Sequence, residues 1–220
     1  MIKTRKFQLE LPVHGVTLSG EMNLPEQATG FVIFSHGSGS SRFSVRNNFV
    51  ARILNERSIG TLLFDLLTEE EDSLYANRFD IEVLSERLIA VTKFMKQKHL
   101  IAKLPFGYFG ASTGAASALN AAVSLPKIIE AVVSRGGRPD LAMEKIPEVI
   151  APTLLIVGER DTEVLELNCE VYDKLTCEKK LEVVKGATHL FEEEGTLTEA
   201  AELAADWFEK FLVNKKVILK

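Results

Sequence analysis

The sequence has few cysteines, prolines and glycines, and it lacks a long uninterrupted apolar run. Among its 220 residues there are 2 Cys, 7 Pro and 14 Gly, well below the Pro and Gly content of collagen-like or low-complexity chains. No apolar stretch approaches the roughly 18 uncharged residues that a membrane-spanning helix needs. These absences favour a globular chain with no part inside a membrane.

The chain also lacks an excess of positive charge. It has 26 Lys and Arg against 31 Asp and Glu, a formal net charge of −5. A protein that binds nucleic acid regardless of sequence, or that binds an anionic membrane surface, needs a net basic surface. We therefore expect no nucleic-acid or membrane partner, and we expect a small molecule as the ligand of a monomer or homodimer.

Cysteine usage favours a reducing compartment. Cys169 and Cys177 lie eight residues apart in a segment that we expect to be helical, so about 12 Å would separate them, too far for a disulfide. The basic start Met1–Lys6 leads into an alternating segment rather than the apolar core of a secretory signal. These features predict free thiols and a cytoplasmic protein.

Residues 1–220 are expected to form a single domain. A chain of this length buries roughly 70% of the surface that its unfolded form exposes, and 46% of these residues are apolar. No linker, repeat or low-complexity stretch divides the sequence. The acidic clusters Glu69–Asp72 and Glu192–Glu194 are expected to be solvated loops.

Short apolar runs alternate with amphipathic stretches along the chain. Strands are expected as a hairpin at Arg5–Leu11 and Val16–Asn23, then at Phe31–Phe34, Thr61–Phe64, Phe106–Phe109, Ala131–Val133, Thr153–Val157 and, more weakly, Leu181–Val184. Helices are expected at Asn48–Arg57, Phe79–Lys98, Gly114–Ser124, Val164–Leu175 and Leu197–Val213. This order predicts an α/β fold in which helices cover both faces of a mostly parallel sheet.

One segment that follows a strand has the pattern of a nucleophile. Ligands bind outside the carboxyl ends of the strands in such sheets. Gly110-Ala111-Ser112-Thr113-Gly114 follows a strand, opens a helix and fits the G-x-S-x-G pattern. Its small flanking residues permit a sharp turn that exposes the serine hydroxyl, and the helix N-terminus favours developing negative charge. A helix-capping serine in an ordinary turn is the alternative.

A serine nucleophile needs a base and a carboxylate that orients the base. Ser112, Asp161 and His189 occur in the chain order that α/β-hydrolases use. Asp161 could instead cap the next helix, Glu159 is a neighbouring rival for its role, and His189 could be a loop histidine without a role. The joint presence of all three residues favours a catalytic triad.

Two backbone amides must also stabilise the oxyanion. We expect one from Thr113, directly after the serine, and one from the loop His36-Gly37-Ser38-Gly39, with Ser38 the first candidate and Gly39 the second. This loop lacks the lysine of a P-loop, no dinucleotide fingerprint follows an early strand, and no Cys/His set has zinc spacing. We therefore expect no cofactor and no metal.

Two arginines follow another buried strand and are expected at the same edge of the sheet. Arg135 and Arg138 could hold an anionic substrate group through bidentate pairing. The alternative, which is slightly favoured, is that either arginine pairs with a structural carboxylate such as Asp65 or Asp140.

Jointly, these motifs resemble the α/β-hydrolase superfamily, of the dienelactone-hydrolase-like kind, over residues 30–211. The resemblance rests on His36–Arg42, Gly110–Gly114, Asp161 and Gly186–His189. It implies an eight-stranded, largely parallel sheet whose second strand is antiparallel. The chain is short for this fold and has no long insertion between Val133 and Thr153, so we expect little or no lid. The chain departs from dienelactone hydrolases at Ser112, because those enzymes have a cysteine nucleophile.

The triad and the resemblance predict a serine hydrolase that cleaves a small carboxylic ester, thioester or lactone through an acyl-enzyme on Ser112. Two alternatives stay open. The same triad could transfer the acyl group to an acceptor other than water, or the fold could serve as a non-catalytic ligand-binding protein.

Overall fold

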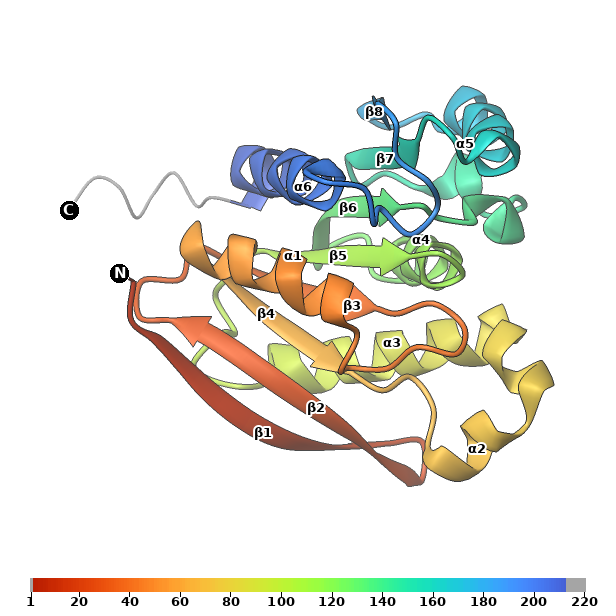
Figure 1. The fold of residues 1–220 in the computed structure, drawn as a ribbon. Helices are drawn as coiled ribbons and strands as arrows, with labels where there is room; N and C mark the ends of the chain where they lie inside the picture. The colour runs from red at the N-terminus through yellow and green to blue at the C-terminus, as the bar shows by residue number, and fades with distance from the viewer. Residues whose placement is uncertain (1, 213–220) are drawn as a thin grey trace.

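The computed structural model describes residues 2–212, which form an eight-stranded sheet with helices on both faces (Figure 1). The strands are β1 (Thr4–Val13), β2 (Val16–Pro25), β3 (Gly30–Ser35), β4 (Ile59–Phe64), β5 (Phe106–Ala111), β6 (Ile129–Arg135), β7 (Thr153–Gly158) and β8 (Lys179–Val184). Their order across the sheet is β1-β2-β4-β3-β5-β6-β7-β8. All eight predicted strands are present, each somewhat longer than its apolar run.

Strand direction agrees with the predicted topology. The hairpin of β1 and β2 is antiparallel, and β2 also pairs antiparallel with β4. Every other neighbouring pair is parallel. The prediction of a mostly parallel sheet with an antiparallel second strand is confirmed. Because the parallel strands point the same way, the carboxyl ends of β3, β5, β6 and β7 lie at one edge, where sheets of this kind bind ligands.

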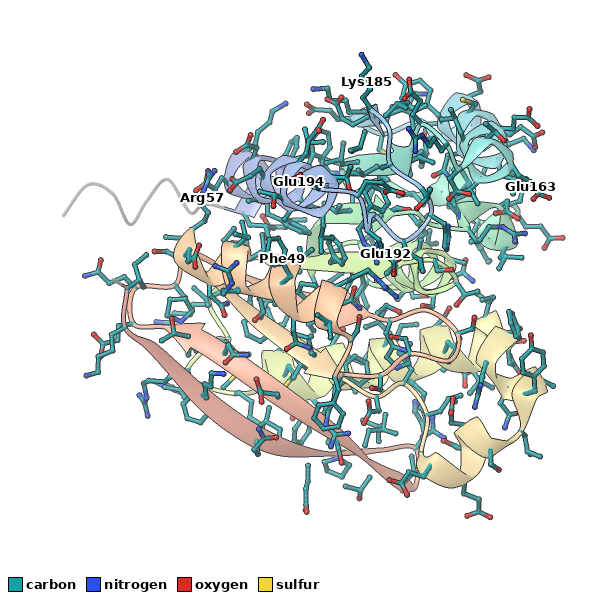
Figure 2. The ribbon with its side chains drawn as sticks, viewed as in Figure 1. Phe49, Arg57, Glu163, Lys185, Glu192 and Glu194 are labelled. Carbon is teal, nitrogen blue, oxygen red and sulfur yellow. The ribbon has the colours of Figure 1, made fainter. Side chains whose placement is uncertain are left out.

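Helices cover the two faces because successive strand side chains point to opposite sides. The helices are α1 (Val45–Glu56), α3 (Ile81–Lys96), α4 (Gly114–Ser124), α5 (Thr162–Lys174) and α6 (Thr196–Leu212). In β3, Val32 and Phe34 pack in the core under α1 and α6, whereas Phe31 and Ile33 pack in the core under the other three helices. Arg57, at the end of α1 (Figure 2), holds α1 against α6 through Glu209, at 2.8 Å.

The five predicted helices are confirmed within a few residues of their expected bounds, although Val213, at the end of the last one, lies outside the described residues. The expected loop at Glu69–Asp72 is wrong, because Glu69–Ser73 forms the short helix α2. A capping box explains this helix: Glu71 N–H donates to the Thr68 hydroxyl, and Thr68 N–H donates to the Glu71 carboxylate.

The two cysteines do not share a helix as expected. Helix α5 ends at Lys174 and Cys177 lies beyond it, but both thiols are free, as predicted. Within residues 2–212, no helix combines the length and the apolar character needed to span a bilayer.

Within residues 2–212, the connections from β6 to β7 and from β4 to α3 contain short helices alone. Between β6 and β7 there are the 3-10 helices η2 (Pro139–Ala142) and η3 (Ile146–Glu148). Between β4 and α3 there are α2 and η1 (Tyr75–Phe79), beyond the carboxyl end of β4 (Figure 1). The prediction of little or no lid therefore agrees with the structure.

Candidate active site

Ser112 lies at the sharp turn between β5 and α4. Its φ is 51°, in the left-handed region that residues with a side chain seldom adopt. Three hydrogen bonds hold the turn: Ser112 N–H donates to Arg135 O at 3.4 Å, and Ser112 O accepts from Ala115 N–H at 3.0 Å and Arg138 N–H at 2.9 Å. A strained residue that is fixed so firmly is typical of a functional site.

The two glycines of the G-x-S-x-G motif are required because the backbone of neighbouring elements lies too close to leave room for a side chain. A Cβ on Gly110 would lie 2.5 Å from Ala115 Cα, and a Cβ on Gly114 would lie 2.2 Å from Ser35 O. Any side chain at either position would force the start of α4 away from β3 and β5. The motif therefore specifies how closely this helix approaches the sheet, in addition to the turn itself.

His189 and Asp161 form a short hydrogen bond between two loops at the same edge. His189 Nδ1 lies 2.6 Å from Asp161 Oδ2. Since a carboxylate can only accept, Nδ1 carries the hydrogen and Nε2 is left as a basic nitrogen. The His189 side chain is 37% exposed and that of Asp161 is 13% exposed, so the imidazole is open to a ligand while its partner is largely covered.

The side chains that the sequence offered as alternatives to this pair make other contacts. Asp161 occupies the N-cap position of α5, but its side chain makes no capping hydrogen bond. Glu159 accepts instead from Gly186 N–H at 2.8 Å and so holds the loop before His189. Glu193 accepts from Thr188 N–H at 3.0 Å, which holds the same loop from its other end and lowers the pKa of Glu193.

Ser112 and His189 line one cavity of about 270 Å³, together with Gly37, Ser38, Arg46 and Arg135. His189 can approach this closely because residue 136 has no side chain: a Cβ on Gly136 would lie 3.1 Å from His189 O. The fold thus brings Ser112 and His189 to a common cavity, from the loops after β5 and β8. Asp161, from the loop after β7, contacts His189 Nδ1 but does not line the cavity.

The predicted oxyanion donors lie beside Ser112, with one interaction that the sequence did not indicate. Ser38 N–H donates to the Thr113 hydroxyl at 2.9 Å, and Thr113 N–H has no acceptor within residues 2–212. Gly39, with φ 67°, lies in the turn that Ser40 N–H closes onto Gly37 O at 3.2 Å. The Thr113 side chain therefore fixes the loop after β3 against the start of α4.

His36 has a structural role that sequence reasoning missed. Leu66 N–H donates to its Nε2 at 3.1 Å, so the ring hydrogen is on Nδ1, which donates to Gly37 O at 2.9 Å. Burial lowers the pKa of His36, which stays neutral. The ring joins the ends of β3 and β4 and so positions the loop that contains Ser38.

The two candidate substrate arginines have different surroundings. Arg138 makes a bidentate ion pair with Asp140, with both N–O distances at 2.8 Å, and is not among the cavity residues. Asp65, the other carboxylate considered for them, binds Arg42. The structure therefore brings Arg135, but not Arg138, to the Ser112 cavity. Within residues 2–212, no group of three or more His, Cys, Asp or Glu side chains is arranged to hold a metal ion.

Comparisons with solved structures give both a fold and a family. A dienelactone hydrolase from Anabaena variabilis is 46% identical, with a TM-score of 0.92 over 95% of this chain and 99% of that one. Est1E from Butyrivibrio proteoclasticus is 16% identical with a TM-score of 0.80, over 92% of this chain and 98% of that one. An esterase from Pyrococcus furiosus is 19% identical with a TM-score of 0.80, over 94% and 92%. The last two, at such low identity, show the fold alone.

Sequence comparison adds curated relatives but no family model, since none matches. Two Mycobacterium tuberculosis proteins, from different strains and provisionally named phosphoribosyl transferases, are 52% identical over 204 residues, which are 93% of this chain. The chain spans 46% of their length, so their name describes a protein about twice as long. The Anabaena enzyme matches nearly end to end at 46% identity, and the chain therefore belongs to the dienelactone-hydrolase-like group of the α/β-hydrolase family.

Proposed function

We propose that the protein is a serine hydrolase in which Ser112, His189 and Asp161 form the catalytic triad. The observation that supports this most strongly is the 2.6 Å bond between Asp161 and His189 at the cavity that Ser112 lines. The bond leaves His189 Nε2 free to take the serine proton, and the carboxylate stabilises the imidazolium that forms. An aspartate at 13% side-chain exposure keeps this bond largely out of water.

The reaction proceeds through an acyl-enzyme. Ser112 Oγ attacks the substrate carbonyl while His189 accepts its proton, and the imidazolium then gives that proton to the leaving group. The Thr113 amide, which has no other acceptor within residues 2–212, stabilises the oxyanion of each tetrahedral intermediate, and the Ser38 amide assists by sharing its hydrogen between the Thr113 hydroxyl and the oxyanion. Water attacks the acyl-enzyme in the second half, with His189 again as base. In this account the Thr113 hydroxyl positions the Ser38 amide beside the Thr113 amide.

The substrate that we propose is a small carboxylic ester, thioester or lactone. A cavity of about 270 Å³ lies just below the usual range for drug-sized ligands, which favours a short acyl group. The Anabaena relative is named a dienelactone hydrolase, but a serine in place of the cysteine of that enzyme class gives no reason to prefer lactones. Acyl transfer uses the same residues, and product analysis with added alcohol or amine acceptors distinguishes it from hydrolysis.

Turnover of 4-nitrophenyl acetate and butyrate tests the proposal. Ser112→Ala should lower kcat by at least about 10³-fold, because the nucleophile is lost, while the melting temperature stays close to that of the wild type. Ser40→Ala is the matched control, since Ser40 lines the same cavity and has no part in the mechanism. Equal turnover by folded Ser112→Ala and wild-type protein would contradict the triad.

A further inference from the structure

Arg135 lies at the same cavity as the two proposed reacting side chains, Ser112 and His189. It ends β6 opposite Ala111 of β5, and its carbonyl accepts from Ser112 N–H at 3.4 Å. The next residue, Gly136, lies against His189. The Arg135 side chain lines the cavity that contains Ser112 and His189. A ligand bound near the serine hydroxyl would therefore lie close to this guanidinium.

Arg135 is buried without a carboxylate partner. Only 6% of the residue is exposed, its Nε is fully buried without a hydrogen-bond partner, and no ion pair within residues 2–212 includes it. Arg87 shows what such burial normally requires: at 8% exposure it binds Glu71 at 2.6 Å and Val13 O at 3.1 Å. A buried cation without an anion costs free energy, so an unpaired guanidinium at the cavity is not explained by stability.

A second arginine adds positive charge to the same cavity. Arg46, in the first turn of α1, lines the same cavity as Arg135. Its carboxylate contact is Glu192 at 3.4 Å, with a side chain that is 66% exposed (Figure 2). Burial, and to a smaller extent Arg46, lowers the pKa of Arg135 to about 10. The guanidinium therefore stays protonated at neutral pH, and among the described residues two arginines but no carboxylate line this cavity.

The nearest structural explanation for Arg135 is its ring contact. Its guanidinium carbon lies 5.4 Å from the centre of the Phe191 ring, and a cation–π contact contributes about 0.5–2 kcal/mol. This contact occupies one face of the guanidinium. It supplies no hydrogen-bond acceptor to the N–H groups, which lie in the plane of the group. Because Nε is buried, the donors that stay available to a ligand are those on the two terminal Nη atoms.

We propose that Arg135, with Arg46, forms a subsite for an anionic group of the ester, a carboxylate or a phosphate. The proposal rests on the serine hydrolase function above and names its substrate class. Arg135 would bind the anion through its terminal Nη–H groups beside Ser112, and Arg46 would bind it from the more exposed side. The anion would supply the partner that the buried guanidinium lacks.

Matched esters test this subsite. The 4-nitrophenyl monoester of glutaric acid has an anionic acyl group, and 4-nitrophenyl valerate is its neutral counterpart of similar length. We expect the wild type to favour the anionic ester in kcat/KM, and Arg135→Met to lower the ratio of the two by about tenfold or more, as loss of a charged hydrogen bond does. Arg138→Gln is the control, because Arg138 is paired outside the cavity, and it should leave the ratio unchanged.

Binding experiments show whether the subsite prefers a carboxylate or a phosphate, and they do not depend on turnover. Calorimetry on Ser112→Ala protein with glutarate and with inorganic phosphate shows which anion binds, and Arg135→Met in that background should abolish the binding. If Arg135→Met fails to fold, Arg46→Ala should weaken the same binding severalfold. Equal kcat/KM of the wild type for both esters, or anion binding that survives loss of Arg135, would overturn the subsite.

The outcomes also separate the subsite from the hydrolase function. Failure of Ser112→Ala to lower turnover of 4-nitrophenyl valerate would contradict the triad, whatever the anion binding shows. Normal, Ser112-dependent turnover without an anionic preference would contradict the subsite alone.

Discussion

Thr113 contributes an amide and a hydroxyl to the same region, and the two groups have separate roles. The amide follows the nucleophile and has no acceptor within residues 2–212, while the hydroxyl accepts from Ser38 N–H at 2.9 Å. The hydroxyl therefore ties the two proposed oxyanion donors together. No feature of the sequence indicated this tie, because the loop after β3 and the turn after β5 are adjacent only in the folded sheet.

Replacing this hydroxyl should affect catalysis more than substrate binding. Thr113→Val keeps the shape of the side chain but removes the acceptor for Ser38, so we expect kcat toward 4-nitrophenyl butyrate to fall about tenfold, the equivalent of one hydrogen bond, with KM little changed. Thr113→Ser restores the hydroxyl and should recover most of the loss. An increase in kcat for Thr113→Val would show that the hydroxyl competes with the oxyanion for the Ser38 amide.

His36 makes the stability of the fold depend on pH in a defined direction. Burial lowers the pKa of His36 in the folded protein below the value of about 6.5 that a histidine has in an unfolded chain. As the pH falls through 6.5, the unfolded state takes up a proton that the folded state excludes, so the free energy of unfolding decreases. The stability that neutral His36 gives is complete above this window and is lost below it.

Melting temperatures at pH 7 and pH 5 measure this effect. His36→Gln cannot titrate, and its melting temperature should fall less between the two pH values than that of the wild type, even though the variant is less stable at pH 7. His99→Gln is the control, since His99 is exposed, and it should keep the pH dependence of the wild type. An identical pH dependence for His36→Gln and the wild type would contradict a buried neutral His36.

The unit formed by β5, the turn at Ser112 and α4 depends on tight packing at its two glycines. A Cβ on Gly114 would meet Ser35 O at 2.2 Å, and carbonyl oxygens of a strand cannot move aside without disturbing the ladder. Beneath the turn, the Ser35 and Ser117 hydroxyls form a 2.7 Å hydrogen bond between β3 and α4. The position of Ser112 therefore depends on the packing of β5, the turn and α4 together.

Gly114→Ala should therefore destabilise the protein by about 1–3 kcal/mol, as overpacking in a close-packed interior does, and should also lower kcat. Urea unfolding and ester turnover measure the two effects. Gly15→Ala is a control for the loss of a glycine, because Gly15 has φ 79° but no atom within 4 Å of an added Cβ. It should reduce stability modestly without a change in turnover. Unchanged stability of Gly114→Ala would contradict this account of the turn.

Elements with a strong apolar pattern could be predicted from the sequence. The short helix α2, which depends on contacts between residues close in sequence, was missed. The buried runs of β3, β5 and β7 left no alternative to strands covered on both faces. The acidic residues of α2 were expected to be a loop, because their helix depends on a capping box and not on an apolar face. Helix α5 was extended too far because Leu175 continues its apolar pattern although its backbone is extended.

At the scale of the molecule, the sequence predicts that the motifs following the parallel strands come together, because these strands all end at one edge of the sheet. Ser112 and His189 accordingly line one cavity. The pairing of arginines could not be predicted in this way: Asp65 binds Arg42 and Asp140 binds Arg138, and Arg135 has no carboxylate partner among the described residues. Which carboxylate neutralises which arginine depends on loop positions that sequence spacing does not determine.

The most direct test of the triad is covalent labelling of the wild-type protein with a fluorophosphonate probe, followed by mass spectrometry of the labelled peptide. We predict a single adduct on Ser112 and a labelling rate that falls at least about 10²-fold in His189→Ala, which keeps the serine but removes its base. Folded wild-type protein that takes up no label, or that is labelled at another residue, would contradict the proposed serine hydrolase.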